Sequence, residues 1–125
     1  MLNMKKNPGK RAKELHNEIK DEFKKRKITV AVGNTNSDFS LVGTSEKYMQ
    51  EDVLNAMNED EIVAKPNYDK HAEEDIIQEA EKRKVKVTNI GASRPICIDC
   101  EKLIKENNIT SHTTFSGKKS KKRRK

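Results

Sequence analysis

Residues 28–43 of this 125-residue chain read ITVAVGNTNSDFSLVG, and this stretch decides the fold. The β-branched run 28–32 stops at Gly33, and a second apolar run, 39–42, stops at Gly43. The residues between the two runs, 34–38, are dense in turn formers. Two short runs of this kind joined by such a turn predict a β-hairpin.

Helices and strands are predicted to alternate on either side of the hairpin. Upstream, apolar residues recur three or four positions apart between charged ones, which predicts one amphipathic helix over residues 10–26. These apolar residues are Ala12, Leu15, Ile19 and Phe23. Downstream, the predicted elements are, in order, a short helix near 53–57, a helix over 71–83, a strand over 85–90, a helix over 97–107 and a strand over 109–115.

This order of elements predicts an α/β fold with three layers. A hairpin followed by strands that alternate with helices gives one mixed β-sheet of about four to five strands, with helices packed on it. The length of 125 residues suits one small domain, which we expect to span residues 1–117. Residues 118–125 are expected to form a disordered basic tail.

The net charge of +7 is distributed unevenly along the chain. Residues 118–125 carry seven basic residues and no acidic one, and residues 1–27 carry ten basic and four acidic residues. Residues 28–117 carry ten basic and sixteen acidic residues. Two basic ends on an acidic body suit binding to a polyanion such as DNA or RNA. A solubilising tail or a localisation cluster is the alternative interpretation of residues 118–125.

Hydropathy and cysteine content indicate a soluble protein that works in a cytoplasm. No apolar run approaches the length of a membrane span, and the polar start of the chain is not a signal peptide. The two cysteines are three residues apart and cannot join distant elements. A free Cys-x-x-Cys pair suits a reducing compartment.

The chemistry of the chain is concentrated in two short motifs, His71-Ala72-Glu73 and Pro95-Ile96-Cys97-Ile98-Asp99-Cys100. The combination of H-x-E with P-C-x-x-C is the signature of zinc-dependent nucleobase deaminases. Two cysteines in the first turn of a predicted helix face one side, where the helix N-terminus stabilises their thiolates. With His71 they supply three zinc ligands and leave a fourth position open, as in catalytic zinc sites. Glu73 is then placed to carry protons without binding the metal.

Each motif taken alone has a common alternative. A single Cys-x-x-Cys is often a redox pair or half of a zinc ribbon. A ribbon needs a second cysteine pair, and Cys97 and Cys100 are the only cysteines of the chain. A thioredoxin-like redox pair lies at the first helix of a βαβ unit, whereas this pair comes late. The order and spacing of both motifs together favour the deaminase.

From about residue 28 to residue 115 the chain resembles the cytidine deaminase-like superfamily, and most closely the deaminase domains of bacterial polymorphic toxins. Those domains carry a His-Ala-Glu triplet and a late Arg-Pro-x-Cys segment, as residues 71–73 and 94–97 do here. The resemblance implies zinc held by His71, Cys97 and Cys100, with Glu73 as proton shuttle. Ile96, inserted between Pro95 and Cys97, fits the toxin branch better than the nucleoside-salvage branch.

Candidate substrate contacts also follow from the resemblance. It implies that the base is held by the backbone of Ala72 and by the loop before Cys97, which contains Ser93 and Arg94. An asparagine often contacts substrate near the end of the second strand in this superfamily; here Thr44-Ser45 stands there, and Asn34 or Asn36 is the substitute. Tyr68 is the leading candidate for stacking on the base, with packing on the sheet edge as its alternative role. Tyr48 is the second choice for stacking.

The expected activity is zinc-dependent hydrolysis of cytosine to uracil in single- or double-stranded DNA. The resemblance implies a secreted toxin effector that acts in the cytoplasm of a target cell, and a dedicated immunity protein as partner. The alternatives are deamination of RNA, free nucleosides or adenine, or a non-catalytic zinc-containing module that binds nucleic acid.

Overall fold

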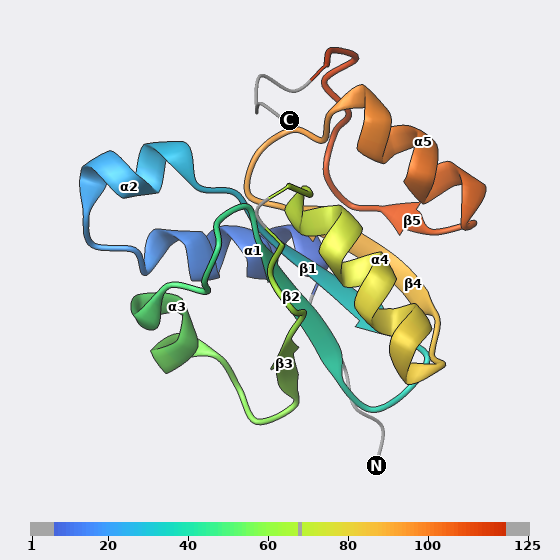
Figure 1. Ribbon diagram of the computed structural model, residues 1–125, viewed down its shortest axis with the longest axis horizontal. Helices are drawn as coiled ribbons and strands as arrows, with labels where there is room; N and C mark the ends of the chain where they lie inside the picture. Colours follow the sequence, from blue (N-terminus) through green and yellow to red (C-terminus); the bar gives the residue numbers. More distant parts are fainter. Residues whose placement is uncertain (1–6, 68, 120–125) are drawn as a thin grey trace.

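The computed structural model describes residues 7–67 and 69–119, which form a mixed α/β structure (Figure 1). The elements in chain order are α1 (Pro8–Asn17), α2 (Glu22–Lys27), β1 (Val30–Thr35), β2 (Ser40–Thr44), α3 (Glu51–Ala56), β3 (Glu61–Val63), α4 (Ala72–Arg83), β4 (Val87–Ala92), α5 (Ile98–Glu106) and β5 (Thr110–Ser111). The predicted fold class is confirmed.

The five strands form one mixed sheet in the order β3-β2-β1-β4-β5. The predicted hairpin is the antiparallel pair β1–β2, in which Val32 lies opposite Val42. Strand β4 runs antiparallel to β1, while β3 and β5 run parallel to their neighbours β2 and β4. The crossover from β2 to β3 contains α3, and the crossover from β4 to β5 contains α5.

Helices cover both faces of the sheet, with α4 in front and α1 behind in the view of Figure 1. Alternation along β1 divides the core, because successive side chains of a strand point to opposite faces. Val30 and Val32 pack with Leu15 of α1, whereas Ala31 packs in the cluster that contains Ile76 of α4 and Ile104 of α5. None of the helices in the described part of the chain has the length and apolar character needed to cross a membrane.

The N-terminal helix predicted over residues 10–26 is two helices, α1 and α2. Asp21 causes the break, because its side chain accepts hydrogen bonds from the backbone N–H groups of Phe23 (3.0 Å) and Lys24 (3.1 Å) and so starts a new helix. Ala12, Leu15 and Ile19 are buried as predicted, but Phe23 is 62% exposed. Its assignment to the buried apolar stripe was therefore wrong.

Both edge strands differ from the prediction. Strand β3 was not predicted, since its three residues follow an acidic stretch and are only half buried. A tertiary ion pair holds its start: Arg11 of α1 donates to both carboxylate oxygens of Glu61 (2.7 and 2.8 Å) and to the carbonyl of Ala56 (2.9 Å). At the other edge β5 is shorter than predicted, and its chain rejoins the core through a bridge between Phe115 and Ile96.

Helix α1 approaches β4 so closely that only glycine fits at position 91. A Cβ added there would lie 2.2 Å from the backbone nitrogen of Gly9 and 2.3 Å from its Cα. We therefore expect Gly91→Ala to displace α1 and to lower the free energy of unfolding by about 2 kcal/mol, the usual cost of overpacking. Urea unfolding measures this, with Lys86→Ala at an exposed position just before β4 as the control that changes little. Equal stability of Gly91→Ala and wild type would contradict the close contact.

Candidate metal centre and pocket

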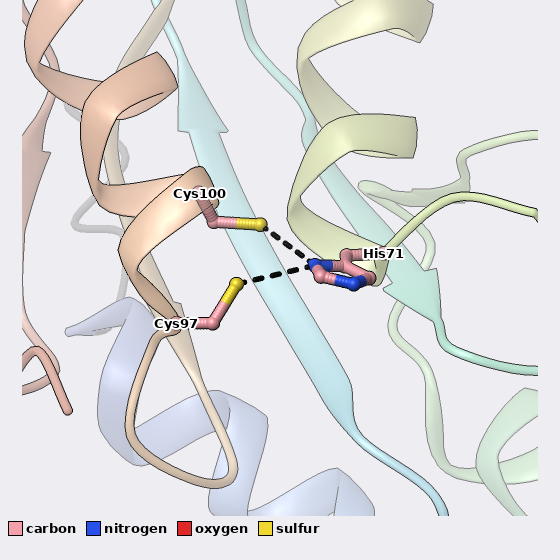
Figure 2. A group of neighbouring side chains, drawn as sticks. All are labelled: His71, Cys97 and Cys100. Atoms are coloured by element: carbon pink, nitrogen blue, oxygen red, sulfur yellow. Dashed lines mark hydrogen bonds between the residues drawn. The ribbon is translucent and has the colours of Figure 1, made fainter. Parts of the chain in front are cut away.

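Three potential metal ligands meet where two neighbouring helices begin (Figure 2). His71 is the N-cap of α4, Cys97 is the N-cap of α5, and Cys100 lies in the first turn of α5. The Nδ1 atom of His71 lies 3.1 Å from the Sγ of Cys100 and 3.3 Å from the Sγ of Cys97. The three ligand atoms all lie within 4.8 Å of one another, so the group can hold one metal ion.

The donor set fits zinc. In a tetrahedral site with ordinary Zn–N and Zn–S bonds, a nitrogen and a sulfur ligand are about 3.6 Å apart, close to the distances seen here. One imidazole and two thiols are ligands that zinc prefers over magnesium or calcium. Three protein ligands leave the fourth tetrahedral position for water or substrate. These residues are thus compatible with zinc as the predicted cofactor.

Hydrogen bonds within the cluster shift the pKa values of its three residues in different directions. The hydrogen bond from Cys100, assisted by His71, lowers the pKa of the Cys97 thiol to about 3. The same bond to Cys97 and burial raise the pKa of Cys100, while the bond to Cys97 also raises the pKa of His71. The lowered pKa favours the thiolate form of Cys97, and a thiolate is the form that binds a metal.

Glu73 lies beside these ligands without being one of them. It is the second residue of α4 and only 5% exposed. The Cys100 thiol donates a long hydrogen bond of 3.8 Å to its Oε1. Burial raises the pKa of the Glu73 carboxyl, whereas a bound cation would act in the opposite direction. A carboxyl whose pKa is raised by burial, and would be lowered by a bound cation, is suited to proton transfer.

The next two acidic residues of α4 position the histidine. The backbone N–H of His71 donates a hydrogen bond to the Glu74 side chain (2.7 Å), and this bond spans the first turn of the helix. The Asp75 carboxylate accepts from the backbone N–H of Asn67 (3.2 Å) and thereby fixes the loop that leads to His71. Neither of these two contacts was predicted from the sequence.

The Glu74 contact gives a testable effect on metal affinity. Glu74→Ala removes the acceptor that fixes the backbone of His71, and we expect zinc affinity to fall about 10-fold to 100-fold, as for other groups that orient a ligand. Glu74→Gln keeps an oxygen acceptor and should restore most of the affinity. Titration against a chromogenic chelator measures both variants, with Glu81→Ala on the exposed side of α4 as the control. Full affinity in Glu74→Ala would contradict the positioning role.

The candidate metal centre forms part of the wall of a pocket of about 1080 Å³. His71, Ala72, Glu73 and Cys97 line its inner part, and all but Cys97 are buried. Five basic and two acidic residues contribute to the lining. The basic residues are Lys24, Lys27, Lys47, Arg94 and Lys119, and the acidic residues are Glu46 and Glu73. The pocket therefore combines an inner metal centre with a basic rim.

Two of the predicted substrate contacts, Ala72 and Arg94, line this pocket. The Arg94 guanidinium nevertheless donates to the carbonyls of Arg26 (2.8 Å) and Ile28 (3.1 Å), so it ties the loop before Cys97 to the α2–β1 connection. Ser93 is not among the lining residues. Its Oγ accepts from the backbone N–H of Val30 (3.0 Å), which gives it a structural role at the start of β1.

The structure does not bring Asn34 to the pocket. Asn34 lies near the far end of β1, where it is buried and exchanges side-chain hydrogen bonds with Asn89 (2.8 Å) and Ser40 (2.7 Å). Asn36 pairs with the backbone of Lys86 and is equally remote from the lining residues. Tyr68, the leading stacking candidate, lies outside the described residues. Tyr48 lines the pocket and is 76% exposed.

Several residues that line the pocket were not predicted as site residues from the sequence. Phe23, Lys24 and Lys27 reach it because helix α2 turns away from α1, and the N-cap signal of Asp21 is the sequence feature that could have revealed this turn. The C-terminal segment reaches it because it runs beside the cysteine loop. Ile98 donates its backbone N–H to the carbonyl of Lys118 (2.9 Å), which places Lys119 at the pocket.

Comparison of the chain with protein-family models, with curated proteins and with solved structures finds no match. The geometry of the metal centre and its pocket is therefore the basis for assigning a function. That geometry defines a group able to hold a metal ion, compatible with zinc.

Proposed function

We propose that this protein is a zinc-dependent hydrolase that deaminates cytosine to uracil in DNA. The observation that carries the proposal is the placement of Glu73: a buried carboxyl beside, but outside, a His-Cys-Cys ligand group on the wall of a pocket. A structural zinc site needs no such neighbour and usually has four protein ligands. The resemblance of residues 71–73 and 94–100 to deaminase motifs supports the same conclusion.

The reaction requires a nucleophilic water and a group that moves its proton. Zinc, when bound, supplies the first by lowering the pKa of a bound water to about 7. Glu73 takes the proton of the attacking water while a C–O bond forms at C4 of cytosine. It delivers this proton to N3 and then moves the proton of the new C4 hydroxyl to the amino group, so that the C4–N bond breaks, ammonia leaves and a C4 carbonyl remains. The replacement of nitrogen by oxygen at C4 leaves the oxidation state of the carbon unchanged, so no oxidant or reductant is needed.

Charge around the pocket supports a polymeric anion as substrate. Lys24, Lys27 and Lys47 are exposed at the pocket, and Lys119 of the basic C-terminal segment also lines it. Residues 120–125 add five further basic residues to this segment. Each cation near a phosphate releases condensed counterions and so favours binding to nucleic acid. The role as a toxin effector, with an immunity protein as partner, rests on the resemblance alone.

The direct test is an incubation of zinc-loaded protein with defined substrates. Matched oligonucleotides carry cytosine or adenine in DNA or RNA, and free cytidine is a fifth substrate. We expect conversion of cytosine in DNA, read by sequencing as C-to-T changes and by ammonia release. Conversion confined to RNA, adenine or cytidine would replace the substrate assignment. No conversion of any of the five substrates would overturn the proposal that the protein is an enzyme.

Truncation separates polymer from nucleoside substrates. Removal of residues 120–125 leaves the contact of Lys118 with Ile98 intact and deletes five positive charges. For a polymer-acting enzyme, we expect weaker binding and a shallower dependence of the binding constant on salt. Turnover of a free nucleoside should not change. A tail of the same length made of serine and glycine serves as the control for chain length.

A further inference from the structure

Two exposed aromatic rings flank the pocket of the proposed deaminase. Phe23 of α2 is 62% exposed and Tyr48, after β2, is 76% exposed, and both line the pocket. The other aromatic residues in the described ranges, Phe39 and Phe115, are partly buried against the core. Phe23 and Tyr48 therefore contribute little to folding, and their position at the pocket calls for a different role.

The surroundings of these rings are cationic. The Nζ of Lys27 lies 4.6 Å from the centroid of the Phe23 ring, and Lys24 follows Phe23 on the same short helix. Lys47 immediately precedes Tyr48 and is exposed. Aromatic rings interleaved with lysines are the combination that binds unpaired nucleotides, because bases stack on the rings while phosphates contact the cations.

The depth of the metal centre distinguishes between kinds of strand. His71 and Glu73 are 9% and 5% exposed, so only a base that has left its neighbours can reach them. In a duplex the flanking bases remain stacked on each other and leave protein rings at the rim without partners. In a single strand the flanking bases are free to stack on Phe23 and Tyr48.

We propose that the substrate is single-stranded nucleic acid, whose nucleotides on either side of the target base stack on Phe23 and Tyr48 while Lys24, Lys27 and Lys47 contact its phosphates. This inference rests on the proposed function, because it identifies the substrate class of the same pocket. It adds that the choice between single strand and duplex is made by residues at the rim of the pocket and not by the metal centre.

Binding to a strand without cytosine tests the inference independently of turnover. Full-length, zinc-loaded protein is titrated into a fluorescein-labelled thymidine oligonucleotide of about 15 nucleotides, near the upper size of single-strand sites. An adenine–thymine hairpin duplex with the same number of phosphates, and a uridine strand, are compared by anisotropy. We expect the single strands to bind at least about tenfold more tightly than the duplex. Equal or tighter binding of the duplex, or no binding of any strand, would overturn the inference.

Removal of the rings gives the second measurement. Each of Phe23→Ala and Tyr48→Ala should weaken single-strand binding about tenfold, and Phe23→Trp should retain it. Leu54→Ala is the matched control, since Leu54 is an exposed apolar residue (45%) outside the pocket lining. Both rings are on the surface, so these variants are expected to fold, and circular dichroism with zinc analysis checks this. Unchanged single-strand affinity of the variant that combines Phe23→Ala with Tyr48→Ala would refute the stacking role.

The lysines are tested through salt dependence. Replacing Lys24 and Lys47 by alanine should reduce the slope of log affinity against log salt by about 1.4 for single strands, or about 0.7 for each phosphate that is no longer neutralised. Lys82→Ala with Lys86→Ala, at exposed positions outside the pocket lining, removes the same charge and should change the slope less. Equal slopes for the two pairs would contradict a phosphate track at the rim. Strand binding without any deamination would instead contradict the proposed function alone.

Discussion

Glu73→Gln is expected to lower the turnover number by at least ~10³-fold, within the range attributed to a positioned general acid–base group. The amide preserves the shape of the side chain but can neither accept the proton of the attacking water nor return one. Because Glu73 is outside the ligand group, one zinc ion per chain should remain bound. The carboxyl is also costly to bury in charged form, so the variant should be as stable as wild type or slightly more stable.

Three measurements on the Glu73 variant make the result decisive. Rates come from a single-turnover assay on a cytosine-containing strand, zinc content from mass spectrometry, and stability from urea unfolding. Glu81→Gln makes the same chemical change at an exposed position of the same helix and should behave as wild type. A Glu73→Gln protein with the wild-type rate would remove Glu73 from the mechanism. A variant that has lost both zinc and activity would indicate a structural role.

Loss of a metal ligand is expected to have the second large effect. Zinc sites in small proteins provide roughly 10–16 kcal/mol in total, so one of three protein ligands accounts for roughly two to four orders of magnitude in zinc affinity. We expect His71→Ala and Cys100→Ser to purify with little zinc. Both should also unfold at lower temperature, because a bound metal would join the N-termini of α4 and α5.

Two comparisons separate metal loss from damage to packing. His112→Ala replaces an exposed histidine outside the ligand group and should retain zinc and stability. Wild-type protein stripped of zinc by a chelator should melt at the same temperature as Cys100→Ser, whose side chain has nearly the same volume. A Cys100→Ser protein that retains one zinc per chain would contradict the assignment of this ligand.

Elements near the site were well predicted because their signals are local. The hairpin was predicted from β-branched runs and turn formers, and the pairing of β1 with β2 bears this out. Helices α4 and α5 begin one residue after the predicted starts, since His71 and Cys97 serve as their N-caps. The convergence of His71, Cys97 and Cys100 was predictable because each lies at the start of a helix in an alternating fold.

Features that depend on tertiary contacts were not predictable. Strand β3 is held by Arg11 from a distant helix, a pairing that no local pattern encodes. The exposure of Phe23 depends on the restart of the helix at Asp21, which outweighs a regular apolar spacing. Asn34 was assigned by analogy to a loop position, but the register of β1 against β2 and β4 places its amide between two strands.

The guanidinium of Arg94 has a practical consequence for altering this protein. It donates to the carbonyls of Arg26, in the last turn of α2, and of Ile28, the residue that follows α2, while the loop that contains Arg94 continues directly to Cys97. Among the residues that the structure describes, its hydrogen-bond partners are backbone atoms and not side chains. Side chains of residues 22–25 can therefore be randomised in a library without disturbing these two hydrogen bonds, whereas a change in the length of this segment would displace the cysteine loop.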